Sequence, residues 1–494
     1  MNVSKKINSL KIETRAFING KYVESVSGNK IEKCSSYTGN ELPLITACSE
    51  ADVEIAVSSA RKAFQKGIWK DKTLSERKEI LLKLAELMEN NREELALLDT
   101  LETSRAFHNY YYDSIPKAIE TLRYSAECAD KYYEKSMPPQ KNAYSYMTRI
   151  PLGVVALITP WNDPMVVDAW KYAPALLMGN SVIIKPAEQS SLSLIRLAKL
   201  TKEAGVPDGV FNVLPGYGEV VGKALGLHKG IDGIFFTGSS EVGKMLLSYS
   251  ASSNMKRVGL ECGGKSPLIV TRNCKDIVMA AKVAAENIFY NQGQICSASS
   301  RLIVDSKVYD EFLNALYFEC EKYTPGNPYD SECEVGCVVS KEQFDRINAY
   351  IQLAKEENAV IFSAKKRVDE SYPNAYCIPP TIISGISNDS PVSQEEVFGP
   401  VAVVFKFDSV EDAIEMANDT RYGLAGGVFT DDLNEAYYIS NKIDAGLVHV
   451  NSWGEDQNIT PFGGIKESGI GKDRSMFAFD EYSQLKTIWI KFQK

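Results

Sequence analysis

The sequence predicts an α/β protein with two α/β domains, the first of them built on a doubly wound parallel sheet. From residue 154 onward, short apolar runs of strand length alternate with helical patterns, which is typical of a parallel sheet covered by helices on both faces. A second α/β region extends from about residue 264 to 466. The 494 residues are too many for one core, and this length suggests roughly three domains.

Before the alternating region, the chain predicts a different organisation. Residues 11–48 alternate short apolar runs with turn residues, which predicts a meander of short strands. Apolar residues at helical spacing predict one long amphipathic helix over 74–98 and a second helix over 115–131. The polar segment 135–149 contains two consecutive prolines and is expected to leave the main body.

The alternating region predicts strands at 154–158, 181–185, 210–214, 231–236 and 267–270. The helix after the first strand stops at Gly179-Asn180, and the helix over 192–204 ends at Gly205. Ligands of such sheets bind at the carboxyl ends of the strands. We therefore examine which residues follow each strand.

Three of these strands end in polar sequence: 158–162, 185–188 and 237–243. The last is a glycine-rich turn that opens a helix, and its backbone N–H groups are suited to a phosphate. The spacing is not the G-x-G-x-x-G pattern, so the turn alone is equally compatible with tight strand-to-helix packing. Three polar ends in one sheet favour a nucleotide.

Cys296 ends a Gly- and Asn/Gln-rich turn between a helical pattern at 276–287 and a β-rich run at 301–304. A thiol on such a loop is accessible, and Gly293 would let the backbone approach a ligand closely. Taken alone, this segment leaves open a buried structural cysteine or a nucleophile. A carboxylate is the more economical general base, because the chain has only 3 histidines and none is near Cys296 in sequence.

Composition excludes several classes of function. The 55 Lys and Arg against 64 Asp and Glu give a net charge of −9, which argues against nucleic-acid binding. The 10 cysteines contain no C-x-x-C pair, and no histidine lies in a metal-binding pattern. No apolar run reaches the roughly 18 residues of a spanning helix, and the N-terminus lacks an apolar signal region. We expect a cytoplasmic protein with no metal and no membrane or nucleic-acid partner.

Seven ordered motifs resemble those of the aldehyde dehydrogenase superfamily, in its NAD(P)-dependent, hydrolytic branch. The resemblance covers about residues 17–486. The motifs are Pro160-Trp-Asn162, Lys185-Pro-Ala-Glu188, Phe236-Thr-Gly-Ser239, Glu261-x-Gly-Gly-Lys265, Gly293-Gln-x-Cys296, Glu396-x-Phe-Gly-Pro400 and Pro461-Phe-Gly-Gly464.

This resemblance implies that Cys296 attacks the aldehyde carbon, giving a thiohemiacetal and then a thioester. The Asn162 amide and the Cys296 backbone N–H would form the oxyanion hole. Glu261 would activate the water that releases the acid and could also take the thiol proton. Lys185 is expected among both the catalytic and the cofactor-binding groups.

The resemblance also implies an NAD site. Lys185 and Glu188 would bind the adenosine ribose, and the Glu188 carboxylate would repel a 2′-phosphate, so that NADP is the less favoured cofactor. Gly238 and Ser239 would lie by the pyrophosphate, and Glu396 and Phe398 by the nicotinamide riboside. The full expected set is Ile158, Thr159, Pro160, Trp161, Lys185, Ala187, Glu188, Gly218, Phe236, Thr237, Gly238, Ser239, Val242, Leu260, Gly263, Glu396 and Phe398.

The domain organisation implied is an NAD-binding domain at 1–129 and 148–260, a catalytic domain at 261–470, and oligomerisation segments at 130–147 and 471–494. In the family, the small β-excursion pairs with the C-terminal strand across subunits, which implies a homodimer or homotetramer. The C-terminal run at 485–492 also predicts a terminal strand, whose edge is available to pair with another chain.

The substrate end departs from the commonest family pattern. A negatively charged tunnel for a cationic tail is suggested by the carboxylates of Asp113, Asp163 and Asp456, to which Glu455 is a further candidate. The alternative is that some of these carboxylates are solvated surface groups. Trp170 and Trp453 would add cation–π contacts. The expected substrate residues are Asp113, Asp163, Trp170, Ile295, Ser297, Trp453 and Asp456.

Several segments look most like γ-glutamyl-γ-aminobutyraldehyde dehydrogenases, with betaine-aldehyde dehydrogenases and broad-specificity neutral-aldehyde enzymes as alternatives. A CoA-acylating enzyme is disfavoured because such relatives generally lack the carboxylate at Glu261. A non-catalytic scaffold is disfavoured because Cys296, Glu261 and Asn162 are all present. A metal hydrolase lacks a ligand cluster.

Overall fold

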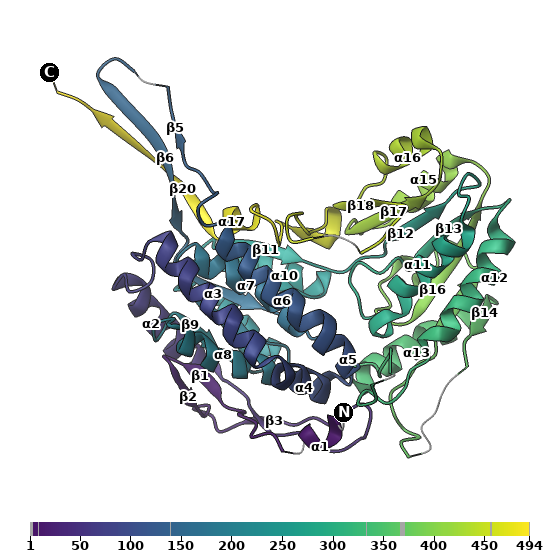
Figure 1. Cartoon of the computed structure of the whole chain (residues 1–494), viewed down its shortest axis with the longest axis horizontal. Helices are drawn as coiled ribbons and strands as arrows, with labels where there is room; N and C mark the ends of the chain where they lie inside the picture. The colour runs from purple at the N-terminus through teal and green to yellow at the C-terminus, as the bar shows by residue number, and fades with distance from the viewer. Residues whose placement is uncertain are drawn as a thin grey trace.

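The computed structural model describes residues 3–7, 9–138, 140–331, 333–365, 371–454 and 457–493. Among the described residues it forms two α/β units and a projecting antiparallel arm (Figure 1). The predicted substrate residue Asp456 and its neighbour Glu455 lie outside the described residues. This architecture confirms the predicted fold class.

The first unit holds an eight-stranded sheet in the described chain. Five of its strands are parallel, and antiparallel strands extend both edges. Along the sheet the strands are β19 (Gly469–Ile470), β11 (Arg257–Glu261), β10 (Gly233–Thr237), β7 (Val154–Ile158), β8 (Ser181–Lys185), β9 (Phe211–Val213), β1 (Ala16–Ile18) and β2 (Lys21–Val23). The strand order reverses between β7 and β10, and open α/β sheets bind ligands at such a point.

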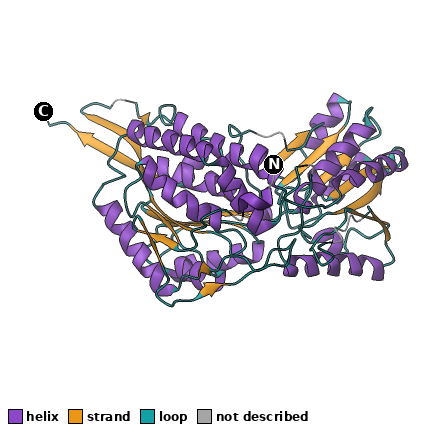
Figure 2. Ribbon diagram, turned by 60° about the horizontal axis from the view of Figure 1, so that its bottom comes forward, coloured by secondary structure: helices purple, strands orange, loops and turns teal. Residues whose placement is uncertain are grey.

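Alternate residues of the central strands face two separate cores. On β7, Val155 and Leu157 pack into one core, whereas Val154 and Ala156 pack into the other. This alternation follows from the two-residue period of a strand. Figure 2 shows helices on both sides of the strands. The helices of this unit are α1 (Val3–Ile7), α2 (Glu50–Gln65), α3 (Leu74–Asn90), α4 (Arg92–Thr103), α5 (Phe107–Asn109), α6 (Ile115–Glu127), α7 (Pro164–Leu177), α8 (Leu192–Ala204), α9 (Lys223–Leu227), α10 (Ser240–Ser252) and α17 (Ala478–Glu481).

Two sequence predictions about this unit are wrong. The helix expected over 74–98 is two helices, because the chain breaks at Asn91, whose side-chain amide donates to Leu87 O (2.7 Å). The strand at 267–270 does not continue the first sheet. It is β12 (Pro267–Val270) of the second sheet, and β11 supplies the fifth parallel strand instead.

The second unit is built on a seven-stranded sheet within the described residues. Its strands are β14 (Val360–Ser363), β15 (Thr381–Ser384), β16 (Val401–Phe407), β13 (Arg301–Asp305), β12, β17 (Ala425–Phe429) and β18 (Leu447–Val450). Its helices are α11 (Ile277–Phe289), α12 (Tyr309–Cys320), α13 (Lys341–Glu356), α14 (Pro391–Gln394), α15 (Val410–Asn418) and α16 (Leu433–Ser440). Short 3₁₀ or π turns lie at Tyr110–Ser114, Gly218–Gly222, Tyr290–Gly293, Glu321–Tyr323 and Lys466–Ser468.

The arm is a three-stranded sheet of β20 (Ser483–Lys491), β6 (Ala143–Pro151) and β5 (Lys135–Ser136). It projects from the body at the upper left of Figure 1. Strand β20 pairs with β6 of the same chain along its whole length, from Ser483↔Pro151 to Lys491↔Ala143. The expected pairing of these segments across subunits is therefore wrong: the arm is complete within one chain.

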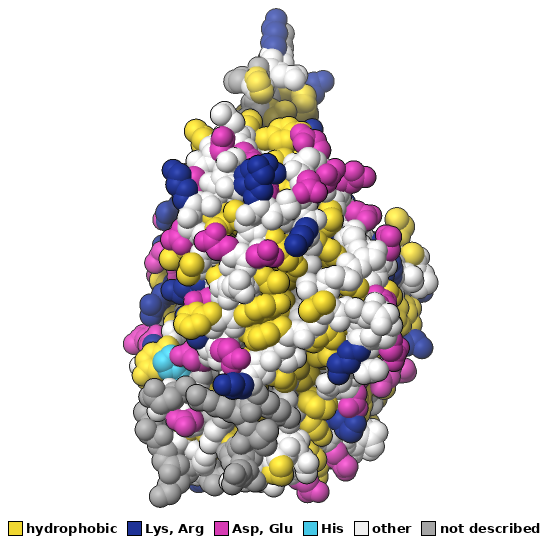
Figure 3. Space-filling view, turned by 90° about the vertical axis from the view of Figure 1, so that its right-hand side faces the viewer, with side chains coloured by type: hydrophobic (Ala, Val, Ile, Leu, Met, Phe, Trp, Pro, Cys, Tyr) yellow, Lys and Arg dark blue, Asp and Glu magenta, His cyan; other side chains and the backbone are white. Residues whose placement is uncertain are grey.

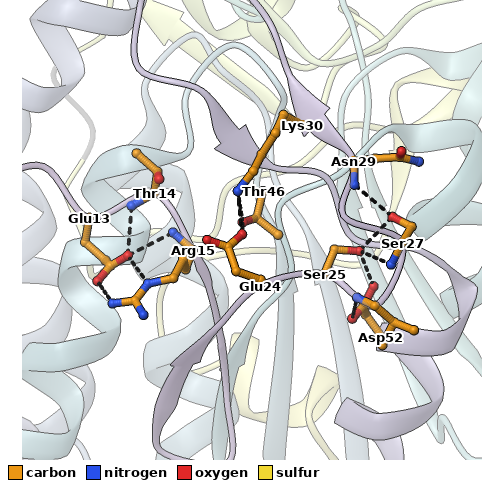
Figure 4. Close-up of polar contacts among 11 residues, drawn as sticks. Glu13, Thr14, Arg15, Glu24, Ser25, Ser27, Asn29, Lys30, Thr46 and Asp52 are labelled. Atoms are coloured by element: carbon orange, nitrogen blue, oxygen red, sulfur yellow. Dashed lines mark hydrogen bonds and ion pairs between the residues drawn. The ribbon is translucent and has the colours of Figure 1, made fainter.

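The N-terminal meander is confirmed as short strands, including β3 (Lys30–Ile31) and β4 (Ile45–Thr46). It is fastened to α2 through Asp52, as Figure 4 shows. The Asp52 carboxylate accepts hydrogen bonds from Ser25 Oγ (2.7 Å), Val26 N (3.0 Å) and Ser49 N (2.8 Å). One buried carboxylate thus caps α2 and anchors the preceding loop.

On the face of the second unit seen in Figure 3, acidic and basic side chains are interspersed among hydrophobic ones. The negative net charge is not concentrated in one block on this face. Among the described residues, none of the helices has the length and apolar character needed to span a bilayer.

Candidate active site

A cavity of about 650 Å³ opens where the strand ends of the first sheet meet the second unit. Its lining brings together the predicted catalytic residues Cys296, Glu261 and Asn162. It also contains the predicted cofactor residues Pro160, Trp161, Thr237, Gly238, Ser239, Gly263, Glu396 and Phe398, and the predicted substrate residues Asp113, Asp163, Trp170, Ile295 and Ser297. Segments far apart in sequence therefore converge on one site.

The loop before Cys296 has an unusual backbone. Helix α11 begins after Asp276, whose carboxylate accepts from Met279 N (2.9 Å) and caps the helix. After it, Asn291, Gln292 and Gly293 all have left-handed φ angles of 52°, 55° and 66°. Consecutive non-glycine residues in this region store strain, which is typical of functional loops.

Gly293 permits a close approach, although not to a ligand as expected. A Cβ at Gly293 would overlap the Gly399 carbonyl, which belongs to the segment that carries Phe398. The glycine thus lets the nucleophile loop and the predicted cofactor segment lie against each other.

The two glycines after Glu261 make similar room. A Cβ on Gly264 would lie 2.6 Å from the Cys296 carbonyl oxygen, and one on Gly263 would overlap the Glu396 carboxylate. Gly264 N also donates to Glu396 Oε1 (3.1 Å). The two glycines after β11 therefore let the predicted base Glu261, the Cys296 loop and the predicted ribose ligand Glu396 lie close together.

The Cys296 thiol is partly exposed in the cavity. Burial of its sulfur raises its pKa to about 12, with the carboxylates of Glu396 and Glu261 adding to the effect. The backbone N–H groups of Ser297 and Cys296 act in the opposite direction. In this state the cysteine is a thiol at neutral pH, so it needs a base to become a nucleophile.

Glu261 ends β11 and is buried. Burial raises its pKa well above the ordinary value, and the nearby Asp473 adds to this rise, whereas Lys171 and Lys472 oppose it. Its Oε2 atom has no hydrogen-bond partner among the described residues. A buried carboxylate oxygen that lacks a protein partner is suited to hold a water molecule or to receive a proton.

Two functional candidates beside Glu261 escaped the sequence reasoning. Lys171 of α7 donates to Asp473 Oδ2 at 2.7 Å, and both side chains are almost fully buried. A lysine on the apolar α7 pattern signals a buried partner, but the sequence does not say which. The pair places a second carboxylate and a cation within electrostatic reach of Glu261.

Asn162 is tied to the nucleophile loop from both ends. Its Nδ2 donates to Gln294 O (3.0 Å), and its own carbonyl accepts from Asn291 Nδ2 (2.9 Å). An amide nitrogen carries two N–H groups. One is used by Gln294, and the second is available to a substrate oxygen.

The remaining predicted cofactor residues are not among those that line the cavity. Lys185 Nζ donates to Glu188 Oε1 (3.0 Å), and a Cβ on Gly218 would lie 4.0 Å from that oxygen. Ser239, which lines the cavity, caps α10 by accepting from Val242 N (3.3 Å), so the glycine-rich turn opens a helix as predicted. Ile158, Thr159, Ala187, Phe236 and Leu260 are buried.

These groups fit a nucleotide. The cavity runs past the N-terminus of α10, a 13-residue helix, and helix N-termini favour phosphate. Thr237 Oγ1, at the end of β10, is buried without a hydrogen-bond partner in the described chain. Such an unpaired donor beside a helix N-terminus is matched by a phosphate or ribose oxygen.

At the substrate end, each described acidic residue has a cationic partner. Asp163 lies 3.1 Å from Arg105 Nη1, and Asp113 lies 2.8 Å from Lys117 Nζ. Trp170 packs on Phe462 with ring centroids 5.0 Å apart. The Arg474 guanidinium lies 5.5 Å from the Trp170 ring centroid. The pocket therefore presents charges of both signs, with Arg105 and Lys117 beside the carboxylates from which a negative tunnel was expected.

Trp453 is placed apart from this pocket. It is buried in the core of the second unit, where its ring lies 5.2 Å from that of His449 and a Cβ on Gly427 would contact it. Gly454, the next residue, lines the cavity instead.

The model of the aldehyde dehydrogenase family matches residues 22–488. The chain belongs to the aldehyde dehydrogenase family. It is 42% identical to the NADP/NAD-dependent aldehyde dehydrogenase PuuC of Escherichia coli, over 99% of this chain and 98% of PuuC. This agrees with the resemblance drawn from the motifs.

Solved structures of family members superpose closely on this aldehyde dehydrogenase. A mutant of the indole-3-acetaldehyde dehydrogenase AldA of P. syringae, in complex with NAD+ and IAA, has a TM-score of 0.97 and 42% identity over 99% of both chains. The γ-glutamyl-γ-aminobutyraldehyde dehydrogenase of Burkholderia cenocepacia has a TM-score of 0.96 and 41% identity over 99% of both chains.

Proposed function

We propose that this aldehyde dehydrogenase oxidises an aldehyde to its carboxylic acid through a covalent intermediate on Cys296. The convergence of Cys296, Glu261 and Asn162 on one cavity carries the proposal. In the first step Glu261 takes the Cys296 proton as the sulfur bonds to the aldehyde carbon. The carbonyl oxygen becomes an oxyanion, which accepts hydrogen bonds from Asn162 Nδ2 and Cys296 N.

The second half of the reaction releases the product. A nicotinamide cofactor, when bound, accepts the hydride from the thiohemiacetal carbon. Cys296 then carries an acyl thioester. After Glu261 has released the thiol proton to solvent, it removes a proton from water and the oxygen of that water bonds to the acyl carbon. The carbon–sulfur bond then breaks to give the acid, and the Cys296 thiolate takes the proton from Glu261. Lys171 and Asp473 lie within electrostatic reach of Glu261 and help to set its protonation state.

NAD is the cofactor we propose. Its phosphates would lie at the N-terminus of α10, beside Gly238 and Ser239, and its adenosine ribose near Lys185 and Glu188. The Glu188 carboxylate accepts hydrogen bonds from ribose hydroxyls and repels a 2′-phosphate, which favours NAD over NADP. The AldA structure contains NAD+, whereas PuuC is named for both cofactors.

For the substrate we propose an aminoaldehyde, with a γ-glutamyl-aminobutyraldehyde as the first choice. Its γ-glutamyl end carries an ammonium and a carboxylate, and the pocket offers Asp113 and Asp163 beside Arg105 and Lys117. A tail with charges of both signs pairs with this lining better than a purely cationic one does. The relative from B. cenocepacia bears this substrate in its name.

The test is NADH formation with a matched panel of aldehydes: γ-glutamyl-γ-aminobutyraldehyde, 4-aminobutyraldehyde, betaine aldehyde, butanal and benzaldehyde. We expect the γ-glutamyl substrate to have the highest kcat/KM, by about tenfold or more over butanal, since one or two such polar contacts contribute roughly 1–3 kcal/mol. Cys296→Ala is the control and should form no NADH with any of them. Equal kcat/KM for charged and neutral aldehydes would remove the substrate proposal and leave the dehydrogenase chemistry intact.

We also propose that the arm joins copies of this chain into a dimer or tetramer. Strand β20 has one unpaired edge in the described sheet and exposes Leu485, Trp489 and Ile490. Large apolar side chains on a projecting sheet edge favour association with another surface.

A further inference from the structure

Arg105 lies where the two α/β units meet. Helix α4 ends two residues before it, and Ser104 takes a left-handed φ of 55° at the helix end. The following backbone bonds to the second unit: Ser104 O accepts from Cys337 N (3.0 Å), and Phe107 N donates to Pro328 O (2.9 Å). Arg105 is therefore carried by first-unit backbone that is fixed against the second unit.

The Arg105 side chain is 3% exposed and reaches a residue from each unit. Its Nη1 lies 3.1 Å from Asp163 Oδ1, and its Nη2 donates to the Tyr290 hydroxyl (2.8 Å). The guanidinium also lies 4.9 Å from the Tyr110 ring centroid and 5.1 Å from that of Tyr290. A buried arginine with a carboxylate, a hydroxyl and two aromatic rings around it is held in one orientation.

Both polar partners of Arg105 belong to segments that carry groups of the proposed mechanism. Asp163 follows Asn162 and precedes α7, and Tyr290 opens the strained turn that leads to Cys296. The Asn162 turn and the Cys296 loop already share the Asn162–Gln294 and Asn291–Asn162 hydrogen bonds. Through Asp163 and Tyr290, Arg105 provides a second link between the Asn162 turn and the Cys296 loop.

The charge of Arg105 also matters at this place. Burial opposes its charged form, but Tyr290 and Asp163 together raise the pKa of the guanidinium, so it stays charged. Asp163 is only 25% exposed. Without Arg105, this carboxylate would stand unpaired in the lining of the same cavity, on the residue that follows Asn162. An unpaired negative charge in the site destabilises a forming oxyanion.

We propose that Arg105 is a positioning residue: it holds the Asn162 turn against the Cys296 loop and cancels the charge of Asp163 in the cavity where the oxyanion forms. The inference rests on the oxyanion role of Asn162 in the proposed function. It goes further by assigning to a residue outside the seven motifs the task of joining the two units at the reacting centre.

The first test compares Arg105→Met, Arg105→Lys and a matched control, Arg196→Met. The Arg196 side chain is 20% exposed and pairs with Glu94 of α4 (2.8 Å), but it does not line the cavity. We expect Arg105→Met to lower kcat for butanal about 100-fold, the order of loss that misplacement of a catalytic group by about 1 Å produces. The dissociation constant of NAD, measured by fluorescence titration, should change by less than about threefold. Arg196→Met should lose stability and keep its kcat.

Arg105→Lys keeps the charge and loses the two-pronged geometry, so its kcat should lie between wild type and Arg105→Met. The double variant Arg105→Met, Asp163→Asn removes the uncompensated carboxylate. It should recover about tenfold of the lost kcat, and it avoids a buried unpaired charge if Arg105→Met fails to fold. A kcat for Arg105→Met equal to that of Arg196→Met, or no recovery in the double variant, would overturn the proposal.

Asn162→Ala separates this inference from the proposed function. If Asn162→Ala retains wild-type kcat, the oxyanion role fails and Arg105 has nothing to position. If Asn162→Ala loses kcat about 100-fold or more while Arg105→Met does not, the proposed chemistry stands and only the role of Arg105 falls.

Discussion

At the scale of single residues, the site depends on burial as much as on residue type. Glu261 and Cys296 are ordinary side chains whose pKa values are both raised, chiefly by burial. Burial therefore favours the neutral form of each group, and only the ionised form of Glu261 can take a proton from the Cys296 thiol or from water. The protonation state of Glu261 then decides whether it can activate water.

We expect Glu261→Gln to form its first equivalent of NADH more slowly than wild type, because glutamine cannot take the thiol proton, and then to turn over more slowly still, because glutamine cannot remove the proton of the attacking water. Loss of a general base typically lowers the rate about 10²–10⁴-fold. Stopped-flow absorbance of NADH separates the burst from the steady state. Wild-type steady-state turnover in this variant would remove Glu261 from the mechanism.

The same residue predicts a pH dependence. The ionised carboxylate of Glu261 is the active base, and burial raises its pKa well above the ordinary value of a glutamate. The wild-type kcat should therefore rise as the pH increases through this raised pKa. Glu261→Gln should lack this rising limb. The comparison requires kcat for both forms over the same pH series.

At the scale of elements, the turn at Tyr290–Gly293 depends on a close backbone approach. A side chain on Gly293 would meet the Gly399 carbonyl, and the residue has a φ of 66°. The nucleophile loop and the segment with Glu396 and Phe398 are thus packed backbone to backbone. Their relative placement is set by packing between two loops, and neither loop alone specifies it.

Gly293→Ala should lower kcat by about 100-fold or more, because relieving the overlap must move one of the two loops by about 1 Å. Gly39→Ala is a matched control, since Gly39 has a similar φ of 73° and no atom within 4 Å of its added Cβ. Both variants carry the backbone strain, but only Gly293→Ala carries the overlap. Equal kcat values for the two would show that the Gly399 contact does not matter for catalysis.

At the scale of the whole molecule, the arm is folded by its own chain and presents an apolar surface outward. Leu485 and Trp489 lie four residues apart on β20, hence on the same face of the strand. We expect the double variant Leu485→Glu, Trp489→Glu to shift the protein from dimer or tetramer to monomer in light scattering after size-exclusion chromatography. Gln484→Glu, on the opposite face, is the control and should not. An unchanged mass for the double variant would exclude this face from the interface.

Local pattern was sufficient for the strand Ser181–Lys185 and the helix Leu192–Ala204, which have their predicted bounds. Gly205 ends that helix with a left-handed φ of 110°, a conformation that glycine adopts without strain. The same approach failed at Asn91, because the continuous apolar period hides a break that the side chain of Asn91 stabilises by bonding back to Leu87 O. It also assigned the strand 267–270 to the wrong sheet, because the residues that form a strand do not indicate which other strand it pairs with.

By itself, the sequence determined the α/β class, the strand-end motifs, and which side chains carry the proposed chemistry, because turns, periods and motifs are local. Only the tertiary structure decided how charges meet across the chain. Lys171 pairs with Asp473 over 302 residues of sequence, and Arg105 reaches Tyr290 over 185. The arm likewise pairs with itself within one chain, contrary to the expected exchange between subunits. The physical reason is common to all three: a buried charge or an unpaired strand edge must find a partner, and the fold alone determines which partner lies within reach.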